Sequence, residues 1–342
     1  MSNYENNLYT LPDTYSGEYE VSSLSPRDYY HRRSVGYIPV NKVADDKEYL
    51  KDLSVVNDID SQKKKALAAK SRFYNRNINE IIPDIAAAVG YTPVVKPSFE
   101  VVAGKPGLLD RHRAYFEFTF LPCESKKVLI ALPGSFSSPR AVMGEIDDYS
   151  NAYASFWAKK CWNVYSLPLT LPGKSFPRLG LSSYGIDVSK IVDLSEYIRI
   201  VHGQDAHIAI AGISRGARLA ELVSLFADEI DGVISIGGSA RYDFLTSEFS
   251  TSGKAKGNSW IEGISRDLDV LDLAVKLKKY VYVSVGIADA GSWGESGQSK
   301  IVSLIDMKNR LSDSLFFSYS LFRGGHEANP LQEVDGYEKL VF

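Results

Sequence analysis

The sequence is poor in the residues that build metal centres and disulfide frameworks. Its 342 residues include only 2 cysteines and 5 histidines, and they form no Cys-x-x-Cys, His-Glu-x-x-His or calcium-loop pattern. We therefore expect no metal ion and no other cofactor. Cys123 and Cys161 stand far apart in the chain. This spacing fits reduced thiols in a cytosolic protein, and a single disulfide is the alternative.

Long apolar runs and an excess of positive charge are missing as well. No apolar stretch reaches the roughly 18 residues of a membrane span, and residues 1–10 lack the basic and apolar segments of a secretory leader. We expect no membrane span, no secretion and a cytoplasmic location. A net charge of -3 leaves no broad positive field, so nucleic acid is not an expected partner. The lysines at 63–65 are typical of a solvated helix face.

The beginning of the chain differs from the rest in composition and in hydrophobic pattern. Residues 1–40 are rich in Tyr, Asn, Ser and Pro without periodicity, which indicates an irregular arm. A helical pattern follows, with one helix capped by Asp58 or Ser61 and ending near residue 77, and another over 78–89. We therefore divide the chain into an N-terminal arm with a helical extension, residues 1–96, and a second domain, residues 97–342.

The second domain alternates short β-rich runs with helical ones, a pattern that predicts an α/β fold with a mostly parallel sheet and helices on both faces. Eight strands are predicted, at residues 99–102, 114–121, 127–132, 162–167, 207–211, 232–236, 280–285 and 315–321. The predicted helices cover residues 141–160, 188–201, 215–227, 268–277 and 300–310. The third, fifth and sixth strands are almost entirely apolar, as expected for strands that helices cover on both faces.

A Gly-x-Ser-x-Gly pattern joins the fifth strand to the helix that follows it. Gly212 and Gly216 flank Ser214 at a spacing that lets strand and helix approach closely, while the sharp turn lifts the serine hydroxyl above the sheet. The short pattern also arises by chance as an inert turn. Its place between an apolar strand and an amphipathic helix favours a nucleophilic serine.

A serine hydroxyl needs a base to remove its proton, and histidine, with an unperturbed pKa of about 6.5, is suited to the task. His326 follows the eighth strand after two glycines, which free the backbone to carry the ring over the strand ends. The other histidines, at positions 31, 112, 202 and 207, lie in the arm, in a charged loop or ahead of the fifth strand. We expect these four to have surface or packing roles.

An aspartate completes the set. Asp289 follows the seventh strand in a glycine-flanked loop, so the order along the chain is Ser214, Asp289, His326. From residue 97 onwards the sequence resembles the α/β-hydrolase superfamily, and the resemblance implies that Asp289 orients the imidazole of His326. Asp243, after the sixth strand, is the alternative, but its bulky neighbours favour a surface ion pair or a cap contact.

The same resemblance implies two backbone amides that stabilise an oxyanion. One is the N–H of Arg215, directly after the serine. The other is expected in the loop after the third strand, from Ser135 in preference to Phe136, although Pro133-Gly134 stands where many members of the superfamily have His-Gly.

Two further segments bear on the site. Residues 239–267 are long and aromatic, so they are expected to form a cap over the site or a surface elaboration. Residues 168–175 miss a phosphate-binding loop because Pro168 replaces its first glycine, and Pro172 and Pro177 also oppose it. We interpret them as the loop after the fourth strand, beside the substrate pocket.

The resemblance implies a serine hydrolase that cleaves a carboxylic ester through an acyl-enzyme, as an esterase or deacetylase. Its expected partner is a small-molecule or acylated substrate. Peptidase and acyltransferase activity remain alternatives, because the same residues serve all three reactions. A non-catalytic binding module on the same fold is disfavoured because all three residues of the triad are present.

Overall fold

A mostly parallel sheet lies at the centre of the protein. The computed structural model describes residues 78–89, 91, 100–101, 108–111, 114–135, 137–170, 175–176, 181–238, 270–286, 311, 313–322 and 324–342. Within them the main sheet has seven strands, in the order β12-β11-β10-β9-β5-β6-β4. Their bounds are β4 Thr119–Leu121, β5 Lys127–Leu132, β6 Asn163–Ser166, β9 His207–Ile213, β10 Gly232–Ile236, β11 Tyr280–Gly286 and β12 Phe317–Phe322.

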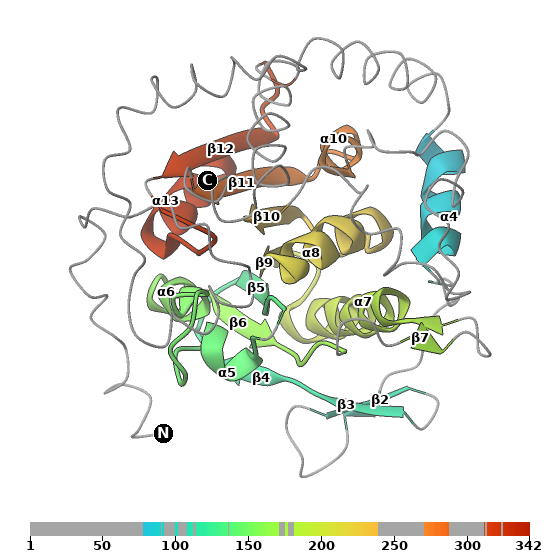
Figure 1. Cartoon of the computed structure of the whole chain (residues 1–342). Coiled ribbons are helices and arrows are strands. Elements are labelled where there is room, and N and C mark those ends of the chain that lie inside the picture. The colour runs from blue at the N-terminus through green and yellow to red at the C-terminus, as the bar shows by residue number, and fades with distance from the viewer. Residues whose placement is uncertain are drawn as a thin grey trace.

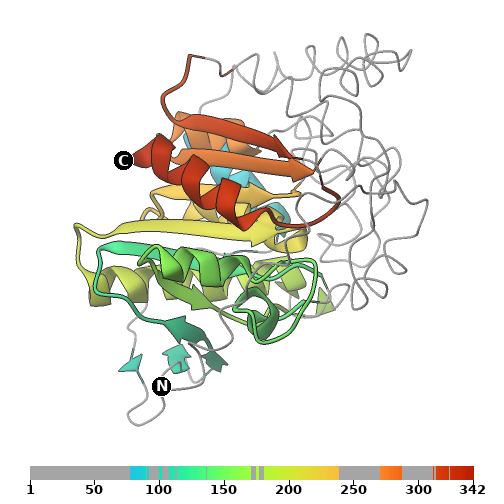
Figure 2. The same cartoon turned by 90° about the vertical axis from the view of Figure 1, so that its left-hand side faces the viewer.

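All neighbouring strands of this sheet are parallel except β4, which pairs antiparallel with β6 at one edge. The parallel strands therefore end at the same side of the sheet, as their arrowheads show in Figure 2. The loops that follow β5, β9, β11 and β12 all start there, so residues from distant parts of the sequence meet at this edge.

Helices cover both faces of the sheet (Figure 1). One face carries α4 (Ile78–Val89), α7 (Ser183–His202), α8 (Arg215–Phe226) and α10 (Val270–Lys276), and the other carries α5 (Pro139–Val142), α6 (Tyr153–Lys159) and α13 (Pro330–Val341). Side chains alternate between the faces along each strand. In β5, for example, Val128 and Ile130 enter the first core while Leu129 and Ala131 enter the second.

Two smaller sheets flank the main one. Strands β1 (Glu100–Val101), β2 (Leu108–Arg111) and β3 (Ala114–Glu117) form an antiparallel sheet. Strands β7 (Ser175–Phe176) and β8 (Leu181–Ser182) form an antiparallel pair ahead of α7.

The predicted α/β architecture is confirmed, but the described main sheet has seven strands and not the eight predicted. The first predicted strand corresponds to β1, in the smaller sheet. The single run 114–121 divides at Phe118 into β3 and β4, because β3 pairs with β2 whereas β4 pairs with β6. Phe118 itself packs against Tyr165 and Tyr197, with ring centroids 5.5 and 5.8 Å away.

The helices also differ from the prediction at two places. The run 141–160 forms α5 and α6 with a turn between them, because Gly144, Asn151 and Ala152 have positive φ angles of 86°, 52° and 51° that a helix does not allow. Helix α13 was not predicted. The predicted helices over 58–77 and 300–310, and the cap segment 239–267, lie outside the described residues.

Cys123 and Cys161, expected as reduced thiols, form a disulfide, which was the alternative. Cys123 lies two residues after β4 and Cys161 two residues before β6. The antiparallel pairing of these strands brings the α-carbons of the two cysteines to 5.3 Å. No helix of the described residues is both long and apolar enough to cross a membrane.

Candidate active site

Ser214 lies at the sharp turn between β9 and α8. Its backbone angles, φ 57° and ψ −115°, fall in a region that residues with a side chain rarely adopt. The N–H of Ser214 donates to the carbonyl oxygen of Ile236 in β10 at 2.9 Å, which holds the turn against the neighbouring strand. The serine side chain is half-buried at the carboxyl edge of the sheet. This is the geometry expected for an activated nucleophile.

The two glycines of the motif allow this turn to pack tightly. A methyl group on Gly212 would lie 2.1 Å from the carbonyl oxygen of Gly216, and one on Gly216 would lie 2.4 Å from the carbonyl oxygen of Pro133. Both distances are shorter than any tolerated contact, and the obstacles are backbone atoms. The glycines therefore bring strand, helix and the loop after β5 together around Ser214.

The two predicted oxyanion donors lie on the segments that meet at this turn. Arg215 is the first residue of α8, where backbone N–H groups have no partner inside the helix. Ser135 lies in the loop after β5, and its N–H donates no hydrogen bond to any of the described residues. Phe136, the alternative to Ser135, lies outside them.

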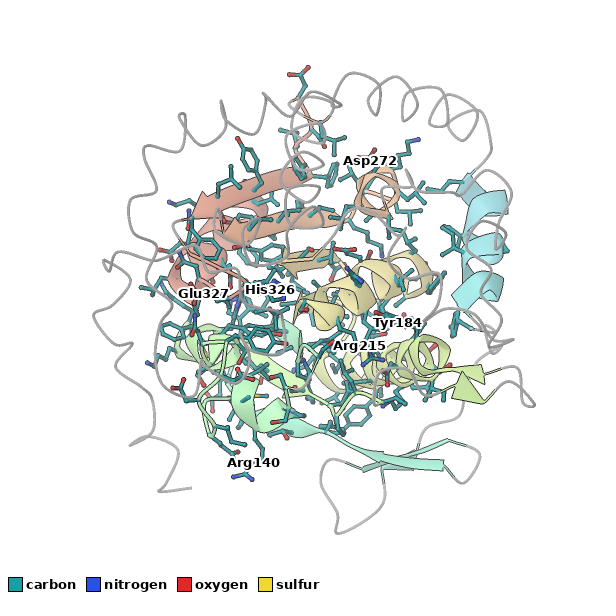
Figure 3. The ribbon with its side chains drawn as sticks, viewed as in Figure 1. Arg140, Tyr184, Arg215, Asp272, His326 and Glu327 are labelled. Carbon is teal, nitrogen blue, oxygen red and sulfur yellow. A yellow bond between two sulfur atoms is a disulfide. The ribbon has the colours of Figure 1, made fainter. Side chains whose placement is uncertain are left out.

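The side chain of Arg215 is held away from bulk solvent by a buried ion pair. Its Nη2 donates to Oδ2 of Asp187 in α7 at 2.8 Å, and both residues are buried. Asp187 also accepts from the N–H of Thr170 at 2.9 Å and pairs with Lys190 at 2.8 Å. The ring of Tyr184 lies over the guanidinium group, and Figure 3 shows the two side chains together between α7 and α8. The cluster fixes the loop after β6 against the start of α8.

His326 lies on the loop between β12 and α13, where Figure 3 also places Glu327. The imidazole is buried. Its loop is attached to the turn ahead of α6: the N–H of Ala328 donates to the carbonyl oxygen of Tyr149 at 3.2 Å, and the side-chain amide of Asn151 donates to the carbonyl oxygen of Ala328 at 2.7 Å. The structure thus brings Ser214 and His326 to the same edge of the sheet.

Both candidates for the acid, Asp289 and Asp243, lie outside the described residues. The strand that leads to Asp289 is described up to its end at Gly286. A methyl group on Gly286 would lie 2.2 Å from the carbonyl oxygen of Gly325 and 2.4 Å from that of Gly324. The end of β11 at Gly286, three residues before Asp289, therefore lies directly against the loop that carries His326.

The buried carboxyl group of Glu333, which was not predicted, also supports the loop that carries His326. Oε1 of Glu333 in α13 accepts from the N–H of Asn329 at 2.7 Å and from the hydroxyl of Ser284 in β11 at 3.0 Å. Burial raises the pKa of Glu333 to about 8, nearby Glu327 adds to the rise, and the two hydrogen bonds oppose it. A largely protonated Glu333 thus joins β11 to the start of α13 at neutral pH.

The remaining described histidines lie elsewhere. His202, at the end of α7, has its Nε2 2.8 Å from the hydroxyl of Tyr165. His207 begins β9, at the opposite end of the strand from Ser214, with its Nε2 3.0 Å from the hydroxyl of Tyr337. Burial lowers the pKa of both rings. His31 and His112 lie outside the described residues.

Comparison with known proteins identifies the fold. No family model and no curated protein sequence matches this chain. Among solved structures, it is similar to a glucuronoyl esterase from Solibacter usitatus, with 13% identity, a TM-score of 0.50 and coverage of 79% of this chain and 93% of that one. An acetyl xylan esterase from Thermoanaerobacterium is 12% identical with a TM-score of 0.45, over 78% of this chain and 94% of that one.

An acylaminoacyl peptidase from Pyrococcus horikoshii is also similar, with 14% identity and a TM-score of 0.42. That match covers 68% of this chain but only 38% of the peptidase, so this chain spans well under half of its length. At these identities the likeness concerns the fold. With a mostly parallel sheet, helices on both faces and a serine turn between β9 and α8, the chain has the α/β-hydrolase fold.

Proposed function

We propose that the chain is a serine hydrolase that cleaves a carboxylic ester through an acyl-enzyme. The observation that carries the proposal is the backbone of Ser214, held at φ 57° and ψ −115° between β9 and α8. Such a conformation costs roughly 1–3 kcal/mol and persists where the surrounding structure imposes it, as at nucleophilic turns. An inert turn would not require it.

The chemistry follows from the positions of the groups. The hydroxyl oxygen of Ser214 attacks the ester carbonyl while His326 takes the hydroxyl proton. The N–H groups of Arg215 and Ser135 donate to the oxyanion of the tetrahedral intermediate. His326 then gives the proton to the departing alcohol. A water molecule, deprotonated by the same ring, attacks the acyl-enzyme, and the ring returns that proton to the oxygen of Ser214 as the acid leaves.

We assign the orienting acid to Asp289. It lies three residues beyond Gly286, whose backbone contacts the Gly324-Gly325 segment ahead of His326. A carboxylate that follows this strand has a short path to the imidazole. Asp243 lies six residues beyond Gly237, whose N–H donates to the carbonyl oxygen of Ser284, so its path to His326 is longer.

An ester is the first substrate class to test, because the glucuronoyl esterase of similar fold is by its name an esterase. Peptidase and acyltransferase activity use the same groups, and the acylaminoacyl peptidase of similar fold keeps that alternative open. We expect a small-molecule or acylated substrate. A cytoplasmic location stays a prediction, and the Cys123–Cys161 disulfide argues against it, since disulfides persist in oxidising compartments.

The test of the nucleophile is covalent labelling. A fluorophosphonate probe should modify the wild-type protein, with the adduct on the peptide that contains Ser214. Ser214→Ala should abolish the adduct and lower turnover of p-nitrophenyl acetate by about four orders of magnitude or more.

Ser224→Ala is the matched control. Ser224 is a buried serine of α8, the helix that follows Ser214, and its hydroxyl donates to the carbonyl oxygen of Glu221. This variant should keep both labelling and turnover. An adduct elsewhere, or full turnover by Ser214→Ala, contradicts the proposal.

The two candidate acids can be told apart by the same change at each. Asp289→Asn should lower turnover roughly ten-thousandfold, because the amide no longer stabilises the imidazolium. Asp243→Asn should change it little. Circular dichroism should confirm that both variants fold, and the reverse pattern of activities would move the acid to the loop after β10.

A further inference from the structure

One short turn touches two parts of the candidate site at once. Residues 148–151, here called the brace, lie between Gly144 and α6. On one side the hydroxyl of Ser137, in the loop after β5, donates to Oδ2 of Asp148 at 2.5 Å. On the other side Asn151 donates to the carbonyl oxygen of Ala328, two residues after His326. The brace therefore connects the loop that holds the oxyanion donor to the loop that holds the base.

Tyr149 is the member of the brace that reaches both parts with one side chain. Its ring stacks on the imidazole of His326, with centroids 5.8 Å apart and planes inclined by 19°. Its hydroxyl donates to the carbonyl oxygen of Ser135 at 2.9 Å. The side chain is buried, with a relative exposure of 2%. The same hydroxyl packs against Gly134, where an added methyl group would lie 1.8 Å from it.

These contacts restrict the direction of the backbone N–H of Ser135. Because peptide groups are planar, a carbonyl held by a hydrogen bond limits the rotation of the backbone around it. The N–H of Ser135 shares its peptide plane with the carbonyl of Gly134, which accepts from the N–H of Ser137 at 3.3 Å. The hydroxyl of Tyr149 holds the carbonyl of the next peptide plane, that of Ser135. Both peptide planes that meet at Ser135 are therefore held, and the N–H of Ser135 keeps a fixed direction. A preorganised donor is what stabilisation of an oxyanion requires.

We propose that Tyr149 is a positioning residue that aligns the oxyanion donor of the Ser135 loop and the imidazole of His326 with each other. The role rests on the proposed function, because it has meaning only if Ser214 is a nucleophile. It differs from general packing in one respect: the hydroxyl serves the donor loop and the ring serves the base, so the two contributions separate by mutation.

Tyr149→Phe removes the hydrogen bond to Ser135 and keeps the ring over His326. We expect kcat for p-nitrophenyl acetate to fall about tenfold to hundredfold, the size of effect that a small misplacement of a catalytic group produces. KM should stay nearly constant, because the donor acts on the oxyanion more than on the bound ester. The pH at which the rate is half-maximal in acid should also stay constant, since the surroundings of the imidazole are kept.

Tyr149→Leu removes the ring as well. The rate should fall further, and the acid limb of the pH profile should move to higher pH, because water that enters the vacated space stabilises the protonated imidazole. A merely structural tyrosine would change the melting temperature without moving this limb. All rates are to be measured well below the melting temperature of each variant.

Tyr337→Phe is the matched control. Tyr337 is also a buried tyrosine with a hydrogen-bonded hydroxyl, but its partner is His207 at the opposite end of the sheet. This variant should lose comparable stability and keep the wild-type kcat, KM and pH profile.

The wild type is tested in parallel with the fluorophosphonate probe. If Ser214 is labelled while Tyr149→Phe keeps the wild-type kcat, the positioning role is wrong and the proposed function stands. The positioning role is also wrong if Tyr337→Phe loses as much activity as Tyr149→Phe at equal loss of stability. If Ser214 takes up no probe and no ester is turned over, the proposed function fails and the role of Tyr149 fails with it.

Discussion

The backbone strain at Ser214 can be measured without reference to activity, by comparing alanine with glycine at this position. Both replacements remove the hydroxyl, so its interactions cancel. At φ 57° and ψ −115° the β-carbon of alanine keeps the strain, worth roughly 1–3 kcal/mol, and glycine relieves it. Glycine also gains freedom in the unfolded chain, which costs roughly 0.4–1 kcal/mol. Ser214→Gly should therefore be more stable than Ser214→Ala by about 1 kcal/mol.

The same pair of changes at Ser224 gives the reference. Ser224 is buried inside α8, where glycine is less stable than alanine by about 1 kcal/mol. The free energies of unfolding, from urea titrations of all four variants, should thus differ in opposite directions at the two positions, by about 2 kcal/mol in total. If glycine destabilises position 214 as much as position 224, the turn is unstrained and the main support for the nucleophile is lost.

Three further changes test the surroundings of the site. Gly286→Ala places a methyl group 2.2 Å from the carbonyl oxygen of Gly325, so the loop carrying His326 should shift and kcat/KM should fall about a hundredfold, while circular dichroism stays native; an unchanged rate would place the base elsewhere. Burial raises the pKa of Glu333 from 4.5 to about 8, so between these values the folded state holds a proton that the unfolded state lacks. As the pH rises through this range, the free energy of unfolding of the wild type should fall by up to about 1.4 kcal/mol per pH unit relative to that of Glu333→Gln. Urea titrations at pH 5, 6.5 and 8 that give parallel curves for the two proteins would show that Glu333 titrates normally. Replacing Cys123 and Cys161 together by serine opens a loop spanning 38 positions and should lower the free energy of unfolding by about 4 kcal/mol, with the rate kept at temperatures where the variant is folded; an unchanged urea midpoint would mean that the bond is absent in the protein.

The fold was predictable where a local pattern decides the structure. The run 127–132 is apolar throughout most of its length and forms β5 with the predicted bounds, as residues 232–236 form β10. Helix α13 was missed because polar and charged residues interrupt its apolar ones. Its buried residues, among them Glu333, Val334 and Tyr337, are recognised only once β11 and α6 lie beside them. Its stability comes from tertiary contacts and not from its own periodicity.

In the candidate site, too, the local motif was predictable from the sequence and the contacts between distant residues were not. Ser214 carries a local signature because the turn demands glycines two residues on each side. The contacts of Asp187 and Tyr149 join them to partners far along the chain: Asp187 pairs with Arg215, 28 positions away, and Tyr149 stacks on His326. A single sequence holds no local pattern for such pairs, so these residues could not be identified before the structure placed them.

The disulfide has a consequence for the continuity of the chain. Cys123 and Cys161 enclose the whole segment that carries β5, Ser135 and the brace. The segment is exposed at Ile146 and Asp147, between α5 and α6. A protease that cuts there would separate Ser135 from Tyr149 in sequence, yet the two pieces would remain one covalent molecule. On a denaturing gel the cut protein should run as a single band until a reducing agent is added. Reduction would then separate the piece that carries Ser135 from the piece that carries Tyr149.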